Sequence, residues 1–155
     1  MQIDYEKRLT ELGFSLPDLP PRAGLYVPAV RTGNLVFCSS QGPLADGAIK
    51  FVGKVGAGLS VEDGMAAARI CALNCLAAIT TVLGSLNGVQ RIVQVRGYVN
   101  SAPDFHDQPK VINGASQLLL DIFGAAGEHA RAAIGTSNLP LDITVELDMV
   151  VEASA

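Results

Sequence analysis

The chain has 155 residues, of which 49% are hydrophobic and 17% charged, so it can bury one sizeable core but is too short for two ordinary domains. Its formal net charge of -4 and its pI near 5.0 give no general attraction to phosphates, and its 11 Lys and Arg residues are scattered, so we expect no nucleic-acid partner. Residues 1–8 lack the basic start and apolar run of a secretory signal, which favours a cytoplasmic protein.

The first residues predict an appendage to the main domain. Residues 4–12 are rich in helix formers and end at Gly13, and the proline-rich residues 16–21 must then be extended. We therefore divide the chain into an N-terminal helix and proline-rich extension, residues 1–23, and one domain, residues 24–155.

A β-hairpin is expected next. Residues 26–31 and 34–40 are rich in β-forming side chains, and Thr32-Gly33 between them is a turn sequence. The glycine-rich residues 42–58 predict a loop or an edge strand.

A long helix follows the glycine-rich segment. The Ser60 hydroxyl can cap the backbone N–H of Asp63, and the helix is expected to run to about Leu83. Residues 64–86 are apolar enough to suggest a membrane span, but polar side chains interrupt them. We interpret this segment as a buried helix and expect no contact with a membrane.

Three cysteines, Cys38, Cys71 and Cys75, cannot all pair within one chain, which is typical of a reducing compartment. Cys71 and Cys75 lie one helical turn apart and could bind a soft metal ion. Because only His106 and His129 are available as further nitrogen ligands, and both are expected in exposed loops, we favour core packing and expect no metal.

Residues 92–100 predict a strand whose valines, Val93, Val95 and Val99, face the core. A second helix begins near residue 107 and carries an apolar stripe at positions 111–123 with i, i+3, i+4 spacing. Such a stripe requires a sheet to cover.

Two further strands close the chain, residues 131–136 and 142–151. We expect them to pair with each other as a hairpin. That register would place Arg131 opposite Asp148 and close to Glu146, so an internal ion pair is one possible role for the arginine.

The predicted order ββαβαββ indicates an α+β domain with one mixed sheet and both helices on a single face. The opposite face would then be uncovered and would carry Gln94, Arg96, Tyr98, Thr144, Glu146 and Asp148. This mixture is neither a core nor a plain solvent-facing surface, so we expect self-association across it in a closed ring.

Four short stretches occur in a recognisable order. They are Tyr26-Val27 followed by residues 33–41 (GNLVFCSSQ), Phe105 followed by Val111-Ile112-Asn113, Arg131, and Leu139-Pro140 followed by Glu146. Their joint order and spacing, over residues 24–152, resemble the RidA family (YjgF/YER057c/UK114) of enamine and imine deaminases.

The resemblance implies a chorismate-mutase-like (ferredoxin-like) fold, a homotrimer and three pockets between subunits. It also implies hydrolysis of reactive 2-aminoacrylate-like intermediates to 2-keto acids and ammonia, without a metal or an organic cofactor. By analogy with the family, Arg131 would bind the carboxylate of this small metabolite and Glu146 would orient or activate water. Tyr26, Ser39 and Asn113 would line the pocket.

The chain also departs from the family pattern. Ser40 replaces the glycine of a Ser-Gly-Gln motif, Ala133 stands where many members have cysteine, and four extra residues separate Phe105 from Val111. These differences place the chain in a divergent subgroup of the family. The resemblance therefore does not determine which substrate this chain would use.

Other functions stay open on the sequence. Glu146 could be merely solvated, and Tyr26 and Asn113 could satisfy backbone groups. Ser39 lacks a nucleophile motif, so a hydrogen bond to a ligand is its strongest expected role. The alternative to a deaminase is a trimer that binds a small carboxylate, such as a 2-keto acid, with a regulatory role. A ribonuclease ranks third because the chain is acidic and has no basic stripe.

Overall fold

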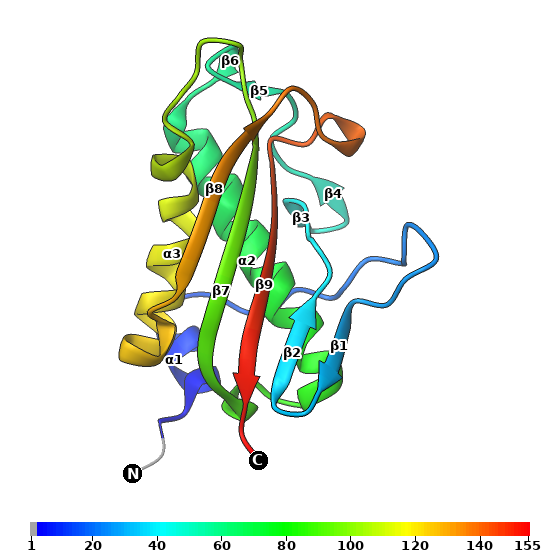
Figure 1. Ribbon diagram of the computed structural model, residues 1–155, viewed down its shortest axis with the longest axis vertical. Helices are drawn as coiled ribbons and strands as arrows, with labels where there is room; N and C mark the ends of the chain where they lie inside the picture. Colours follow the sequence, from blue (N-terminus) through cyan, green and yellow to red (C-terminus); the bar gives the residue numbers. More distant parts are fainter. Residues whose placement is uncertain (1–2) are drawn as a thin grey trace.

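A mixed five-stranded sheet in the order β1-β2-β9-β7-β8 forms the centre of the computed structural model, which describes residues 3–155 (Figure 1). Its strands are β1 (Ala29–Thr32), β2 (Leu35–Cys38), β7 (Val89–Asn100), β8 (Ala130–Thr136) and β9 (Val145–Ala153). The helices are α1 (Tyr5–Glu11), α2 (Val61–Leu83) and α3 (Gln108–Phe123). Shorter elements are β3 (Leu44–Ala45), β4 (Ala48–Ile49), β5 (Lys54–Val55), β6 (Gly58–Leu59) and the 3-10 turns η1 (Leu86–Gly88), η2 (Gly124–Gly127) and η3 (Pro140–Asp142).

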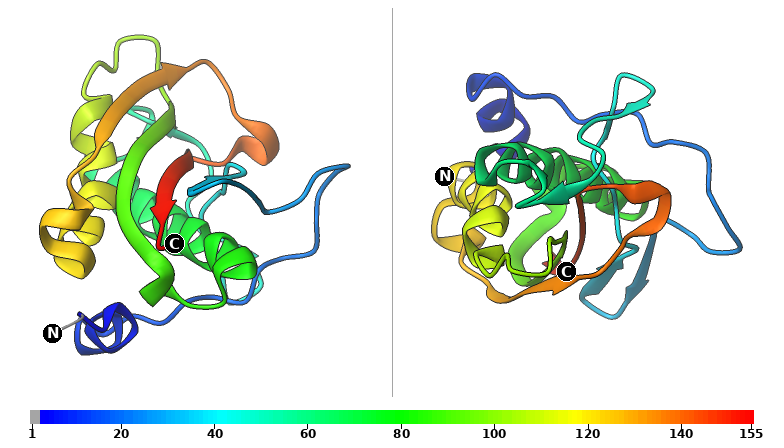
Figure 2. Two further views of the ribbon diagram at one scale, coloured as in Figure 1. Left: turned by 60° about the horizontal axis from the view of Figure 1, so that its bottom comes forward. Right: turned by 90° about the horizontal axis from the view of Figure 1, so that it is seen from above.

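Both long helices pack on one face of the curved sheet, with α1 beyond them (Figure 2, right), which confirms the predicted α+β class. The β1–β2 hairpin is also confirmed, with Thr32 paired to Leu35, although both strands are shorter than expected. Among residues 3–155, no helix covers the opposite face of the sheet.

Helix α2 begins and ends where the sequence predicts. Ser60 Oγ accepts the backbone N–H of Asp63 (3.1 Å), and the Asp63 carboxylate accepts the N–H of Ser60 (2.9 Å). Those bonds from Ser60 lower the pKa of Asp63. Gly84 ends the helix with a φ of 78°, a conformation that glycine adopts without strain.

The interior of α2 shows why its apolar run need not mark a membrane span. By length and composition the helix could cross a bilayer, but Leu76 and Ile79 are fully buried, and the helix packs against α3 and β9. The Cys71 and Cys75 thiols donate to the carbonyls of Val145 (3.4 Å) and Leu147 (3.1 Å). Burial raises the pKa of both thiols, so they are inert core groups, as predicted.

Helix α3 lies unusually close to α2. A Cβ atom added to Gly114 would come within 2.1 Å of the Met65 carbonyl oxygen, so only glycine permits this approach. The predicted apolar stripe of α3 is confirmed as buried, at Val111, Ile112, Ala115, Leu118, Leu119, Ile122 and Phe123.

The predicted C-terminal hairpin is wrong. β8 pairs in parallel with β7, placing Arg131 beside Val95, whereas β9 lies on the other side of β7 and runs antiparallel to it. The segment between β8 and β9, residues 137–144, is long enough to carry the chain across the end of β7. Arg131 and Asp148 are therefore not cross-strand partners.

Strand β7 also departs from simple alternation. Its pairing with β9 shifts between Ile92 and Gln94, which is a β-bulge or a similar irregularity. Val95 and Val99 are fully buried as predicted, but this shift leaves Val93 only half-buried, with Ile92 in the core instead.

The N-terminal extension is anchored to the main domain rather than loosely attached. The Tyr5 N–H donates to Asn87 Oδ1 (2.7 Å), and Glu6 Oε1 accepts from Ser85 Oγ (2.6 Å). Leu9 is only 3% exposed and belongs to the core. The domain boundary at residue 23 stays a prediction. Residues 1 and 2 of the extension lie outside the described part of the chain.

We expect Gly114→Ala to lower the free energy of unfolding by at least about 2 kcal/mol, because the new methyl group would force α2 and α3 apart. Gly88→Ala is the matched control, since its Cβ would approach no atom closer than 3.4 Å. Its effect should stay within about 0.5 kcal/mol. Urea unfolding of the two variants measures both values, and equal effects would contradict the close-contact argument.

Candidate functional site

Arg131 lies on the edge strand β8 and its side chain reaches toward α3. Its Nη1 donates to Asn113 Oδ1 (2.7 Å) and to Ser116 Oγ (3.2 Å), and Nη2 donates to the Pro109 carbonyl (3.4 Å). These acceptors are all uncharged. Within residues 3–155, no carboxylate lies within 4.0 Å of the Arg131 guanidinium, whose residue is exposed.

The predicted ion pair of Arg131 with Asp148 is therefore wrong. Asp148 instead accepts from Arg96 Nε (2.8 Å) and from the Tyr98 hydroxyl (3.1 Å). The reason is the strand order. β7 lies between β8 and β9, and Arg96 of β7 is the cross-strand partner of Asp148. Arg131 keeps its positive charge available at the edge of the molecule.

A short hydrogen-bonded chain supports Arg131 from behind. His129 Nδ1 lies 2.6 Å from the Gly127 carbonyl, which can only accept, so Nδ1 carries the proton. The other ring nitrogen, Nε2, lies 3.0 Å from Ser116 Oγ and can accept its hydroxyl proton. Because the Ser116 hydroxyl donates its proton to His129, its oxygen lone pairs are free to accept the N–H of Arg131 Nη1. His129, expected to be exposed, is half-buried by these contacts.

The sequence reasoning missed Ser116 and the role of His129. A signal for Ser116 was present, because it lies three residues after Asn113 and therefore on the same face of α3. No comparable local pattern points to His129, whose contact with α3 depends on where β8 begins.

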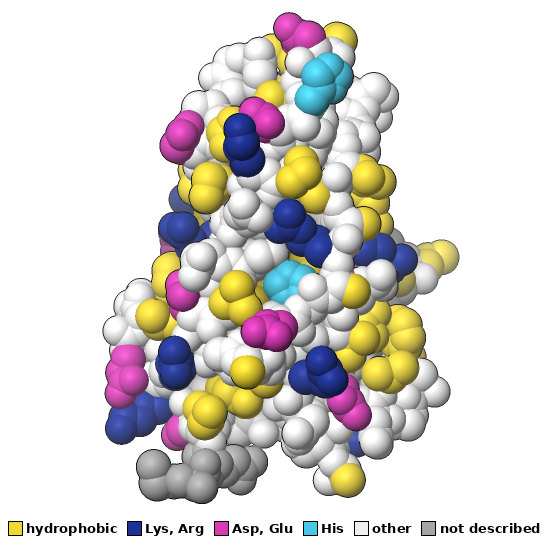
Figure 3. Space-filling view, turned by 60° about the vertical axis from the view of Figure 1, so that its left-hand side comes forward, with side chains coloured by type: hydrophobic (Ala, Val, Ile, Leu, Met, Phe, Trp, Pro, Cys, Tyr) yellow, Lys and Arg dark blue, Asp and Glu magenta, His cyan; other side chains and the backbone are white. Residues whose placement is uncertain are grey.

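Figure 3 shows the face of the molecule on this side, where Lys and Arg side chains are interspersed with Asp and Glu. Basic residues form no continuous stripe on this face.

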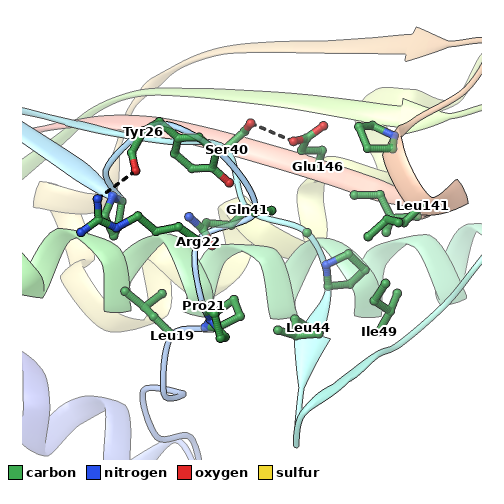
Figure 4. A pocket seen from close by; sticks show the side chains of 17 residues that line it. Leu19, Pro21, Arg22, Tyr26, Ser40, Gln41, Leu44, Ile49, Leu141 and Glu146 are labelled. Atoms are coloured by element: carbon green, nitrogen blue, oxygen red, sulfur yellow. Dashed lines mark hydrogen bonds between the residues drawn. The ribbon is translucent and has the colours of Figure 1, made fainter.

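A separate pocket of about 480 Å³ lies beyond β9, on the side of the sheet away from β8 (Figure 4). Tyr26, Ser40 and Glu146 contribute polar atoms to it, and Ser40 Oγ donates to Glu146 Oε1 at 2.8 Å. Residues 19–23 of the N-terminal extension supply one wall. Two predicted site residues, Tyr26 and Glu146, are thus brought together here.

Ser39 is placed differently from Ser40. Its hydroxyl donates to the Val27 carbonyl (2.6 Å), and it does not line this pocket. Ser40, which replaces a glycine of the family pattern, supplies the hydroxyl that faces Glu146. A ligand-binding role for Ser39 stays a prediction.

One chain does not bring Arg131 and Glu146 together. Arg131 pairs with Val95, whereas Glu146 pairs with Tyr98, and positions 95 and 98 of one strand face opposite sides of the sheet. The predicted site residues therefore form two groups: Arg131 with Asn113 at the β8–α3 edge, and Tyr26 with Glu146 beyond β9.

The uncovered face of the sheet lies between these groups. Arg96, Tyr98 and Asp148 form a polar cluster at its centre, where burial raises the pKa of Tyr98 and Asp148 raises the pKa of Arg96. Around it are large exposed apolar side chains, namely Val30, Leu35, Phe37 and Ile134. Thr144, predicted on this face, is instead buried, and its hydroxyl donates to the Phe51 carbonyl (2.9 Å).

No group of three or more His, Cys, Asp and Glu side chains in the described part of the chain is arranged to hold a metal ion. What the site offers chemically is an exposed guanidinium in one group and a hydrogen-bonded carboxylate in the other.

Comparisons with known proteins agree with this architecture. Residues 6–152 match the family model described as "YjgF/chorismate mutase-like, putative endoribonuclease". The chain is 42% identical to protein TCP17 of Trypanosoma cruzi over 145 residues, 93% of this chain and 91% of that protein.

Solved structures are also similar. A protein of unknown function from Agrobacterium tumefaciens is 41% identical, with a TM-score of 0.89 over 97% of this chain and 92% of its own. A Shewanella oneidensis protein, whose name proposes an endoribonuclease, is 32% identical with a TM-score of 0.93 over 97% of this chain and 99% of its own. Escherichia coli TdcF, solved with bound serine, shares the fold at 24% identity and a TM-score of 0.61, over 88% of this chain and 94% of its own.

The two adjacent serines should respond differently to substitution. Ser39→Ala removes the bond to the Val27 carbonyl and should destabilise the protein by about 1 kcal/mol. Ser40 is exposed whereas Ser39 is half-buried, so loss of the Ser40 bond to Glu146 in Ser40→Ala should change the stability by no more than about 0.5 kcal/mol. Thermal and urea unfolding of both variants test this, and a larger loss for Ser40→Ala would reverse the assignment.

Proposed function

The chain belongs to the YjgF/chorismate mutase-like family, and from this premise we propose that it hydrolyses reactive enamine and imine intermediates to 2-keto acids and ammonia. The observation that carries the proposal is the exposed Arg131 guanidinium, held by uncharged acceptors and near no carboxylate of the described chain. An arginine held in this way is ready to bind an anion from outside.

The hydrogen bonds of Arg131 leave donors for a ligand. Asn113, Ser116 and Pro109 use three of the five guanidinium N–H groups, so the Nε–H and one Nη2–H have no acceptor among residues 3–155. Two such donors can bind a carboxylate through both of its oxygens. Ser116 and Asn113 also fix the plane of the guanidinium, which lowers the entropy lost on binding.

The chemistry after carboxylate binding requires few groups. An enamine first tautomerises to the imine, and a water oxygen then attacks the imine carbon while a proton moves to the nitrogen. The C–N bond of the resulting carbinolamine breaks, the hydroxyl proton leaves with the nitrogen as ammonia, and a keto group remains. Glu146, oriented by Ser40, is our candidate for holding the attacking water and accepting its proton.

This reaction needs Arg131 and Glu146 at one ligand, and we propose that two subunits supply them. The Arg131 edge of one subunit would meet the Glu146 pocket of the next, a head-to-tail contact that closes into a ring of three. The exposed apolar side chains Val30, Leu35, Phe37 and Ile134 support this assembly, because association would remove them from water.

Other activities compete with this proposal. The same pocket could bind a 2-keto acid without turnover, and TdcF, which shares this fold, has been solved with bound serine, an amino acid with a carboxylate. The family description also names an endoribonuclease, but the acidic chain, net charge -4, provides little attraction for RNA. Neither alternative gives a chemical role to the Glu146 carboxylate, which lines the pocket.

The direct test generates 2-aminoacrylate or 2-iminopropanoate in the presence of the protein and follows the release of ammonia and pyruvate. We expect acceleration over buffer that is lost in Arg131→Ala. Saturable pyruvate binding without acceleration would favour the binding protein, and RNA cleavage that depends on Arg131 would favour the ribonuclease.

We further expect complementation between two inactive variants. Arg131→Ala and Glu146→Gln should each lower kcat/KM by about 100-fold or more. Co-assembled from equal amounts of the two chains, a ring should regain about a quarter of the normal activity, because one in four interfaces then combines both intact residues.

The control for complementation is a chain with both substitutions mixed with Arg131→Ala, which restores no intact site. If the two single variants also fail to restore activity although mixed rings form, the two residues do not act at a shared interface.

A further inference from the structure

The pocket beyond β9 is larger than a three-carbon imine requires. Its volume of about 480 Å³ is within the range of sites that enclose drug-sized ligands. In Figure 4, Ser40 and Glu146 point toward each other on one side, and Leu19, Pro21, Leu44 and Ile49 lie on the other. The pocket thus has one polar wall, where the C=N group would react, and a long apolar remainder.

The N-terminal extension supplies Leu19 and Pro21 of the apolar wall and packs against the main domain. Upstream, Arg8 Nε donates to the Asp121 carbonyl of the main domain (2.5 Å), whereas the bond from Arg22 Nη1 to the Tyr26 carbonyl (3.5 Å) lies within the loop itself. Leu19 is half-buried and packs on the core. A wall that packs on the core through Leu19 can select ligands by size.

Leu141, at the rim of the same pocket, provides an independent observation. It has a φ of 58°, in the left-handed region, which disfavours residues that carry a Cβ atom and favours glycine or asparagine. The residue is 77% exposed, so core packing does not explain a leucine here. Strain of this kind is commonly kept at ligand sites, where the side chain has a use.

We propose that this pocket binds the apolar side chain of the substrate, and that the substrates are 2-imino acids derived from apolar amino acids larger than alanine. The inference rests on the proposed function and deepens it. Arg131 would hold the carboxylate, Glu146 would face the C=N group, and Leu19, Ile49 and Leu141 would surround the hydrocarbon chain.

The test compares imines generated in situ from alanine and from leucine by an amino-acid oxidase. The rate of imine hydrolysis is followed by competition with semicarbazide trapping. We expect kcat/KM for the leucine-derived imine to exceed that for the alanine-derived one by at least about 10-fold.

Leu141→Gly is the informative variant because it should fold. Relief of the left-handed strain offsets the added freedom of the unfolded chain, so its melting temperature should stay close to normal. The ratio of kcat/KM for the leucine-derived imine to that for the alanine-derived imine should fall at least about fourfold, which corresponds to the free energy of burying one methylene group. Asp46→Gly is the matched control, because Asp46 has a φ of 53° but does not line the pocket. It should leave the preference unchanged.

The possible failures are distinguishable. Equal rates with both imines, or a preference that Leu141→Gly leaves unchanged, overturn the pocket assignment while deamination stands. If neither imine is hydrolysed faster than in buffer, deamination fails, and calorimetric titration decides the pocket separately. Tighter binding of 4-methyl-2-oxopentanoate than of pyruvate then supports the apolar pocket, and equal binding overturns it.

Discussion

The position of β9 between β2 and β7 is the constraint on which the rest of the molecule depends. β9 pairs with one edge of β7 in the antiparallel direction. β8 can therefore pair only with the other edge of β7, and it does so in parallel. β8 is therefore an edge strand, and Arg131 on it faces α3 rather than the carboxylates of β9. In the same arrangement Asp148 forms an ion pair with Arg96, so Arg131 has no carboxylate partner among the described residues.

This topology divides the site residues between two sides of one subunit. Arg131 with its supports lies at the β8–α3 edge, and Glu146 with Tyr26 lies in the pocket beyond β9. Our proposal that both groups act on one ligand therefore requires a second copy of the chain. The apolar and polar mixture on the uncovered face of the sheet supports such an assembly, and a monomer would expose it to water.

Each half of the site is prepared by residues outside the family motifs. The Gly127 carbonyl, His129 and Ser116 form a hydrogen-bonded chain that holds the Arg131 guanidinium in place. In our proposal, a guanidinium held in this way would bind a ligand with little reorganisation. On the other side, the N-terminal extension converts an open surface near Glu146 into a walled pocket.

By itself the sequence determined the elements whose signals are local. Ser60 with Gly84 bounds α2, the i, i+3, i+4 stripe defines α3, and both follow from hydrogen bonds and side-chain spacing within one helix. The order of motifs also singled out Arg131 and Asn113. In the structure, Arg131 Nη1 donates to Asn113 Oδ1 at 2.7 Å. Only the tertiary structure decided the partner of β8 and the shift that moves Val93 out of the core, because alternation of side chains is the same for a parallel, an antiparallel or a bulged pairing. It alone also decided that Arg131 has no carboxylate partner in the described chain and that residues 19–23 wall the pocket, since both depend on contacts between segments far apart in sequence.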